Sequence, residues 1–162
     1  MRRNDPAIQD LEMTMSKYKR TVYGIAVTQL NNRHEADDVF QEVFLLYFSK
    51  RPVFQTEEQK RAWLIRATVN KCRQYNFGKW NLHVDRTAEP EISAEFESQA
   101  DKELYAAVKE LPPKLREAVY LHWFIGMNVG ETADILGVRA NTVSMRLAKA
   151  KKLLQKRLEE EI

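Results

Sequence analysis

The sequence predicts an all-α protein of two small helical domains joined by an acidic linker, with a helix-turn-helix in the C-terminal domain. Apolar residues recur at steps of three and four along most of the 162 residues, and no run alternates like a half-buried strand. A mostly acidic stretch containing Pro90 separates the two sets of helical segments. We therefore expect domains at residues 1–82 and 100–162, with the linker at 83–99.

The first two helices are expected in the N-terminal domain. One begins after Pro6, since proline is favoured at the start of a helix, and apolar residues then recur at helical spacing. Asn31 and Asn32 mark the turn that ends it. The second helix should cover about residues 34–49.

A loop and a third helix follow. Pro52 disfavours helical structure at the residue before it, so residues 51–56 are expected to form a loop. Thr56 and Gln59 have the spacing of a capping box, in which each side chain binds the backbone N–H of the other residue. The third helix should therefore start at Thr56 and reach about residue 76.

The C-terminal domain begins with two further helices. A fourth helix, around Leu104 and Val108, is broken by Pro112 and Pro113. A fifth helix is expected over about residues 114–125, and it leads into the motif that is the most informative of the chain.

That motif is a helix-turn-helix with its own start and stop signals. Asn128 and Glu131 form a capping box, and Gly137 can take the left-handed conformation that ends a helix. Ala133 is small enough for two helices to cross closely. The second helix carries an apolar stripe of Val143, Leu147, Ala150, Leu154 and Leu158.

The remaining faces of this last helix are cationic. They carry Arg139, Arg146, Lys149, Lys151, Lys152, Lys156 and Arg157, and no acidic residue occurs before Glu159. A helix that is buried on one side, positive elsewhere and preceded by a short glycine turn is suited to the DNA major groove. We favour DNA binding over an ordinary helical hairpin with a solvated basic face.

The charge distribution indicates two contacts with nucleic acid. The net charge of +3 says little by itself. All charged residues at positions 60–79 are positive, whereas positions 85–103 are mostly acidic, and the basic residues then return in the last helix. Two cationic blocks separated by an anionic one favour two contacts with a polyanion, joined by a segment that avoids it.

Several classes of function are disfavoured. Cys72 is the only cysteine, so we expect no disulfide framework and no cysteine-based metal cluster. His34, His83 and His122 lie too far apart for a ligand motif, and there is no glycine-rich phosphate loop. We expect no enzyme activity and no cofactor or metal. Without a signal core or a membrane span, the chain should be cytoplasmic and not inserted in a membrane.

The second predicted helix has more apolar surface than one packing face requires. Its core-facing arc comprises Ala36, Val39, Phe40, Val43 and Tyr47. Phe44 and Phe48 lie to one side, beside Asp37 and Gln41, and Leu45 is nearly opposite. Mixed apolar and acidic surface suits docking to a basic protein partner. Periodicity leaves it open whether Phe44 and Phe48 instead pack beneath a neighbouring helix.

The third predicted helix combines positive charge with aromatic rings. Its apolar side comprises Leu64, Ile65, Thr68, Cys72 and Tyr75, and its other side comprises Trp63, Arg66, Asn70, Arg73 and Phe77. Such groups suit unpaired nucleic acid, because they neutralise phosphates, stack on bases and bind base edges. Phe54 of the preceding loop is another aromatic residue without an evident core position. Trp63 is better explained as an anchor of the fold.

Three segments together resemble the sigma factors of bacterial RNA polymerase. They are ADDVFQEVFLLYF at 36–48, RAWLIRATVNKC at 61–72 and ELPPKLREAVYLHWFIGMNVGETADILGVRANTVSMRLAKAKKLL at 110–154. The spacing and the short chain are similar to the extracytoplasmic-function group, which retains only two domains. The resemblance covers most of residues 15–158.

The resemblance implies a factor that binds core RNA polymerase, recognises promoter DNA and helps to melt it. Docking on the polymerase is implied for Asp37, Asp38, Gln41, Glu42 and Phe44. Contacts with the minus-ten element are expected for Phe54, Lys60, Arg61, Arg66, Asn70 and Arg73, with an extruded base held at Phe54 and Asn70. The acidic linker would thread through the polymerase.

The last helix would read the minus-thirty-five element in the major groove. The residues implied are Asn141, Thr142, Ser144, Met145, Arg146 and Lys149, with Arg116 and His122 near the phosphates. An anti-sigma factor is an expected regulator by resemblance alone. The sequence departs from the usual pattern with Arg139 in place of a capping serine, Thr132 in place of isoleucine, and Gln74 where aspartate is common.

The alternative from another class is an autonomous regulator that binds an operator through its helix-turn-helix and dimerises through the N-terminal helices. Such a regulator needs neither an acidic threading segment nor the docking surface at 37–48. An adaptor protein is a weaker alternative, because it would not need two separate cationic blocks.

Overall fold

The computed structural model describes residues 5–77 and 99–160. The chain divides into two compact units between His83 and Val84, and each unit has its own apolar core. The helical elements within each unit confirm the predicted all-α fold. The predicted linker at 83–99 lies outside the described residues, apart from Gln99, which starts a helix.

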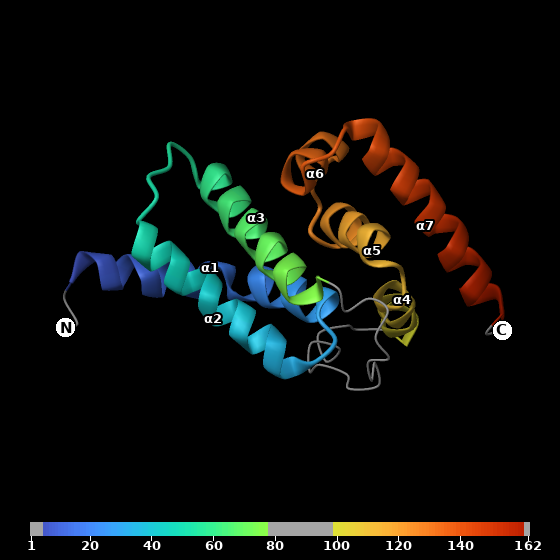
Figure 1. The fold of residues 1–162 in the computed structure, drawn as a ribbon, viewed down its shortest axis with the longest axis horizontal. Coiled ribbons are helices and arrows are strands. Elements are labelled where there is room, and N and C mark those ends of the chain that lie inside the picture. Colours follow the sequence, from blue (N-terminus) through green and yellow to red (C-terminus); the bar gives the residue numbers. More distant parts are fainter. Residues whose placement is uncertain (1–4, 78–98, 161–162) are drawn as a thin grey trace. The chain divides into compact units, whose positions relative to one another are not determined.

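The first unit consists of three helices, α1 (Pro6–Gln29), α2 (Arg33–Lys50) and α3 (Glu57–Asn76). Each packs against the other two, and the loop between α2 and α3 lies at one end of this bundle (Figure 1). The helix bounds lie close to those expected from proline, asparagine and threonine positions.

Side-chain caps start all three helices of the first unit. Asp5 accepts from the backbone N–H of Ala7 at 2.9 Å, and Asn32 accepts from that of Glu35 at 2.7 Å. The predicted Thr56 cap is confirmed by a 3.1 Å bond from the Gln59 N–H. The expected reciprocal bond is wrong in one detail, because the Gln59 side chain accepts from Gln55, at 2.9 Å, one residue before the cap.

The core of the first unit comes mainly from aliphatic side chains. Val22, Ile25, Val39, Val43, Leu64, Ile65 and Val69 are at most 1% exposed. Phe44 joins them at 3% exposed, with its ring centroid 5.0 Å from that of Phe40. Phe44 therefore packs beneath neighbouring helices, and its expected place on the docking surface is wrong. Burial of a side chain of this size contributes about 1.5–3 kcal/mol, which favours the inward position.

The second unit contains α4 (Gln99–Lys109), α5 (Pro113–Val119), the π-helical turn η2 (Tyr120–Phe124), α6 (Val129–Leu136) and α7 (Ala140–Glu160). The predicted break at Pro112 and Pro113 is confirmed. The expected single helix over 114–125 is wrong in its last part, because the Ile125 N–H donates to the Tyr120 carbonyl, five residues back, at 2.9 Å.

The helix-turn-helix of α6 and α7 has the predicted local chemistry. The Asn128 side chain accepts from the Glu131 N–H at 2.8 Å, and the Glu131 side chain accepts from the Asn128 N–H at 3.1 Å. Gly137 ends α6 with φ at 71°, in the left-handed region. The Val138 N–H donates to the Ala133 carbonyl at 3.1 Å, and Ala133 is buried.

The predicted apolar stripe holds α7 against the second unit. Val143, Leu147, Ala150 and Leu154 are buried, whereas Leu158 is half-buried. The guanidinium of Arg157 forms an ion pair with Glu110, just after α4. Packing against α4, α5 and α6 therefore fixes which face of α7 meets solvent.

Candidate nucleic-acid and polymerase interface

The outward face of α7 carries the residues that the sequence assigned to base reading. Asn141, Ser144, Met145 and Lys149 are exposed, and Thr142 and Arg146 are half-buried. These positions lie within the first three turns of α7, on the sides that the buried stripe leaves open. We call these six residues the α7 face. It offers an amide, hydroxyls, two cations and, in Met145 at 72% exposed, an apolar group.

Arg116 does not lie on this surface. It is 3% exposed, and its guanidinium donates to the Lys109 carbonyl at 2.9 Å, so it ties α5 to the end of α4. The expected phosphate contact by Arg116 is therefore wrong, because the side chain is enclosed in the unit. A positive charge in the sequence cannot by itself reveal a buried carbonyl partner.

His122 lies in the π-helical turn and is half-buried. Its Nδ1 is 2.7 Å from the Met127 carbonyl oxygen. A carbonyl can only accept, so Nδ1 carries the hydrogen in this bond. The bond holds the imidazole against the segment that leads into α6, and its expected place near DNA phosphates stays a prediction.

The solvent side of α3 has the predicted chemical character. Arg66, Asn70 and Arg73 are exposed and follow one another at steps of four and three, which places them on one helix face. Phe77, at the end of the helix, is 89% exposed. The opposite side is buried through Leu64, Ile65, Thr68 and Cys72. We call Arg66, Asn70 and Arg73 the α3 face.

The α2–α3 loop is anchored by an aromatic contact. The ring centroid of half-buried Phe54 lies 6.3 Å from that of Trp63, at an interplanar angle of 64°. Trp63 in turn lies 6.0 Å from the ring of Tyr47. The neighbouring Val53 is 96% exposed. Trp63 therefore packs as an anchor, as expected, and the loop presents Val53 to solvent with Phe54 beside it.

Arg51 starts the loop in a conformation that is rare for its residue type. Its φ is 45°, and among residues 5–77 and 99–160 it is the one non-glycine residue with a positive φ. Its backbone N–H donates to the Tyr47 carbonyl at 2.9 Å, and its guanidinium lies 5.3 Å from the centre of the Phe48 ring. These two contacts fix the point at which the chain leaves α2.

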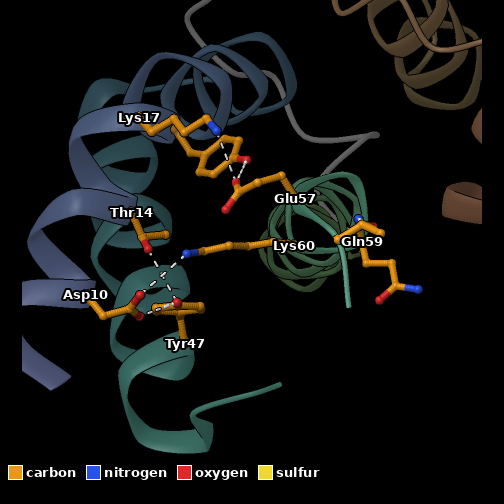
Figure 2. Close-up of polar contacts among 9 residues, drawn as sticks. Asp10, Thr14, Lys17, Tyr47, Glu57, Gln59 and Lys60 are labelled. Atoms are coloured by element: carbon orange, nitrogen blue, oxygen red, sulfur yellow. Dashed lines mark hydrogen bonds and ion pairs between the residues drawn. The ribbon is translucent and has the colours of Figure 1, made fainter. Parts of the chain in front are cut away.

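Lys60 belongs to the packing of the bundle. Its side chain is 14% exposed, with Nζ 3.6 Å from an Asp10 carboxylate oxygen and 5.3 Å from the centre of the Tyr47 ring (Figure 2). Burial lowers the pKa of Lys60, but the Tyr47 hydroxyl and the Asp10 carboxylate outweigh it, and the pKa is raised. Within the unit this charge is paired with Asp10, and the expected contact of Lys60 with minus-ten DNA stays a prediction. Arg61, the next residue, is half-buried.

The outward side of α2 is acidic. Gln41 is exposed, and Asp37, Asp38 and Glu42 are half-buried. Glu42 accepts from the Tyr75 hydroxyl at 3.2 Å.

Two other carboxylates of this surface have neighbours of their own. Asp38 lies 3.7 Å from a ring nitrogen of His34. Burial of Tyr23 and a hydrogen bond with the Asp37 carboxylate raise the pKa of Tyr23.

The apolar member of this surface is Leu45, not Phe44. Leu45 is 63% exposed and follows Asp38 by seven positions and Gln41 by four, so the three share one helix face. We call Asp37, Asp38, Gln41, Glu42 and Leu45 the α2 face. Its spacing was visible in the sequence, but the choice between positions 44 and 45 depended on where α1 and α3 lie.

Two family models match the chain. The model of sigma-70 region 2 matches residues 14–80, and that of sigma-70 region 4 matches residues 101–154. The α2 and α3 faces lie in the first match and the α7 face in the second. No described helix is both long and apolar enough to span a membrane.

Curated relatives are similar over nearly the whole chain. RNA polymerase sigma factor SigV of Bacillus subtilis is 26% identical over 151 residues, covering 91% of this chain and 90% of the relative. The sigma-H factor of Pseudomonas aeruginosa is 22% identical, covering 91% and 86%. The ECF sigma factor SigE of Mycolicibacterium smegmatis is 28% identical, covering 83% of this chain and 56% of its own length.

Two solved structures share the fold. CnrH in complex with the cytosolic domain of CnrY superposes with a TM-score of 0.70 at 21% identity, covering 95% of this chain and 90% of that one. The sigma factor RpoE of Bartonella quintana, in complex with the anti-sigma factor NepR, gives 0.75 at 19%, covering 93% and 98%.

Two helical units, one matching region 2 and the other region 4, define a promoter-recognising subunit of RNA polymerase, which is an initiation factor and not an enzyme. The chain belongs to the sigma-70 family of RNA polymerase sigma factors and is of the extracytoplasmic-function type. The resemblance found in the sequence is thereby confirmed.

Proposed function

We propose that this sigma factor docks on core polymerase through the α2 face, opens the minus-ten element with the α2–α3 loop and the α3 face, and reads the minus-thirty-five element with the α7 face. The observation that carries the proposal is the exposure of Asn70 and Arg66 on α3 and of Asn141 and Lys149 on α7. Cations and amides on two separate units are suited to two separate stretches of DNA.

The α7 face supplies both kinds of contact that a major-groove helix needs. Arg146 and Asn141 can bind guanine and adenine edges, and the exposed Met145 suits a thymine methyl group. Lys149, one turn after Met145, is placed for a phosphate. Thr142 and Ser144 add hydroxyls that bind either. Base contacts would give this face its sequence preference.

The α3 face and the loop suit DNA whose strands have separated. Extrusion of a base costs a few kcal/mol, which stacking and hydrogen bonds to the exposed base can offset. Phe54 offers a ring and Asn70 an amide, while Arg66 and Arg73 offer charge for the backbone of the same strand, and half-buried Arg61 lies in the first turns of the same helix. We assign the extruded base to Phe54 and Asn70.

The α2 face is proposed as the polymerase contact because it combines carboxylates with one exposed apolar side chain, Leu45. An apolar contact surrounded by charged groups is the usual composition of a specific interface. On this assignment residues 1–82 form the docking and minus-ten domain, 100–162 form the minus-thirty-five domain, and the acidic linker at 83–99 threads the polymerase in the cytoplasm.

An anti-sigma partner is also proposed. CnrH was solved with the cytosolic domain of CnrY, and RpoE with the anti-sigma factor NepR, and both share this fold. A protein that covers the α2 face would prevent polymerase docking and so keep this sigma factor inactive.

The proposal is tested by gel shift with the purified chain and a duplex fragment from upstream of transcript starts that its overexpression induces. A sequence-specific complex should form only when core polymerase is added. Tight, specific binding by the chain alone would instead support an autonomous operator-binding regulator. A Leu45→Asp variant should lose the polymerase-dependent complex while keeping its helical content by circular dichroism.

A further inference from the structure

A cluster of polar side chains joins the first half of α1 to the residues on either side of the α2–α3 loop (Figure 2). The cluster consists of Asp10, Thr14, Lys17 and Tyr18 from α1, Tyr47 from α2, and Glu57 and Lys60 from α3. We call it the α1 brace. Asp10, Thr14 and Tyr18 follow at steps of four along α1, so they share one side of that helix, and Lys17 lies next to Tyr18 with its side chain 59% exposed.

One half of the brace is centred on Tyr47, in the last turn of α2. The Tyr47 hydroxyl donates to the Asp10 carboxylate and accepts from the Thr14 hydroxyl at 3.3 Å. Lys60 reaches the same carboxylate from α3, at 3.6 Å. Tyr47 and Thr14 are 5% and 2% exposed, so the bond between their hydroxyls forms away from water, whereas the Asp10 side chain is 55% exposed.

The other half is centred on Glu57, the first residue of α3 and the next after the cap that ends the loop. Its carboxylate accepts from the Tyr18 hydroxyl at 2.7 Å and from the Lys17 amino group at 3.1 Å. Burial and the bond to Glu57 raise the pKa of Tyr18. The start of α3 is thus attached to α1 by the hydroxyl of buried Tyr18 and by Lys17, whose side chain, like that of Glu57, is exposed.

The brace touches both ends of the loop and its aromatic anchor. Tyr47 accepts the Arg51 N–H through its carbonyl at 2.9 Å and contacts the Trp63 ring at 6.0 Å. Trp63 contacts Phe54 at 6.3 Å. A continuous set of contacts therefore runs from Asp10 through Tyr47 and Trp63 to Phe54.

We propose that the α1 brace sets the position of the α2–α3 loop, so that Asp10 and Tyr47 are positioning residues for promoter opening although they touch no DNA. This inference rests on the proposed role of Phe54 and Asn70. Apolar side chains at these positions could hold the helices together without fixing how the ends of α2 and α3 are oriented on α1. Directional hydrogen bonds to the end of α2 and the start of α3 fix that orientation.

The test uses a Tyr47→Phe variant in the assembled holoenzyme. This change keeps the ring against Trp63 and removes only the hydroxyl. Asp10→Asn is a second variant, at a more exposed position, in case the first folds poorly. Thr28→Val is the matched control, since it removes a buried hydroxyl that bonds the Gly24 carbonyl at the far end of α1. Strand opening is measured by permanganate reactivity on a duplex promoter and on the same promoter already melted at the minus-ten element.

A positioning role predicts that Tyr47→Phe lowers opening of the duplex promoter about fivefold, the factor that one hydrogen bond is worth, and leaves complexes on the melted promoter unchanged. The fluorescence of Trp63 is measured in a chain in which the other tryptophans are replaced by phenylalanine. Its emission maximum should shift to longer wavelength in Tyr47→Phe and should not shift in Thr28→Val. Equal opening of the duplex promoter by Tyr47→Phe and the parent chain would overturn the proposed role of the α1 brace. So would an equal loss of opening in Tyr47→Phe and the control Thr28→Val on both promoters. Failure of the parent holoenzyme to open duplex DNA would overturn the proposed function itself.

Discussion

Asn128 and Glu131 cap one another at the start of the helix-turn-helix, each side chain accepting a hydrogen bond from the other residue's backbone N–H, at 2.8 and 3.1 Å. The pair sets the first turn of α6, which in turn supports α7. Asn128→Ala should therefore lower the free energy of unfolding of the second unit by about 1 kcal/mol. Thermal unfolding followed by circular dichroism measures this, and Asn128→Asp, which keeps an acceptor, should unfold close to the parent chain.

Thr132 is a buried residue with an unpaired hydroxyl. It is 0% exposed, and its Oγ1 has no hydrogen-bond partner. Thr132→Val keeps the shape and removes the desolvated oxygen, so it should raise the free energy of unfolding by about 1 kcal/mol. Thr68→Val is the control, because that hydroxyl donates to the Leu64 carbonyl at 2.6 Å, and its removal should not stabilise the chain. A Thr132→Val chain that melts below the parent would contradict this explanation.

The Glu57 carboxylate makes the stability of the first unit depend on pH. Hydrogen bonds from Tyr18 and Lys17 hold the pKa of Glu57 below the usual 4.5. A depressed pKa means that the folded state favours the charged form of Glu57. The resulting stabilisation is fully present above the pKa of the unfolded chain, and it is lost as the pH falls through the lower pKa of the folded state.

The pH prediction is tested with Glu57→Gln. The parent chain should have the higher urea midpoint at about pH 6, and the difference should shrink toward zero at about pH 3. Glu58→Gln, at the next position of α3, controls for the general loss of a carboxylate. A constant difference between parent and Glu57→Gln across this range would exclude the proposed linkage.

Arg146 is proposed to reach a base edge from the α7 face. Arg146→Ala should weaken holoenzyme binding to the cognate promoter by about 1–3 kcal/mol and relax the preference at one base pair. Lys156→Ala, on the same helix but beyond that face, should weaken binding to all sequences alike. Titration against promoters substituted one base pair at a time separates the two effects. An unchanged affinity and unchanged preference would remove Arg146 from the reading set.

The helices and their ends could be predicted because their signals are local. Asn128, Gly137 and Thr56 act on atoms within a few residues, so the sequence contains both partners of each cap. The apolar stripe of α7 was predictable for the same reason. The π-helical turn at Tyr120 had no such signal, since its hydrogen bond differs from an α-helical one by a single residue.

The errors at the candidate site come from partners that are distant in the sequence. Arg116 looks like a surface cation until the Lys109 carbonyl is placed beside it. Phe44 and Leu45 are adjacent, and only the packing of α1 and α3 against α2 decides which one is buried. Periodicity gives the direction of a side chain but not the position of the neighbouring helix.

Asn70, exposed on α3, tests the central claim most directly. The measurement is open-complex formation by core polymerase with the parent chain or with Asn70→Ala, compared with closed-complex affinity on the same promoter. We predict an unchanged closed-complex affinity and a free energy of opening that is less favourable by about 1–3 kcal/mol, the cost of a lost contact with a base edge. An equal reduction at both steps, or no reduction at either, would contradict the assignment of this face to the extruded base.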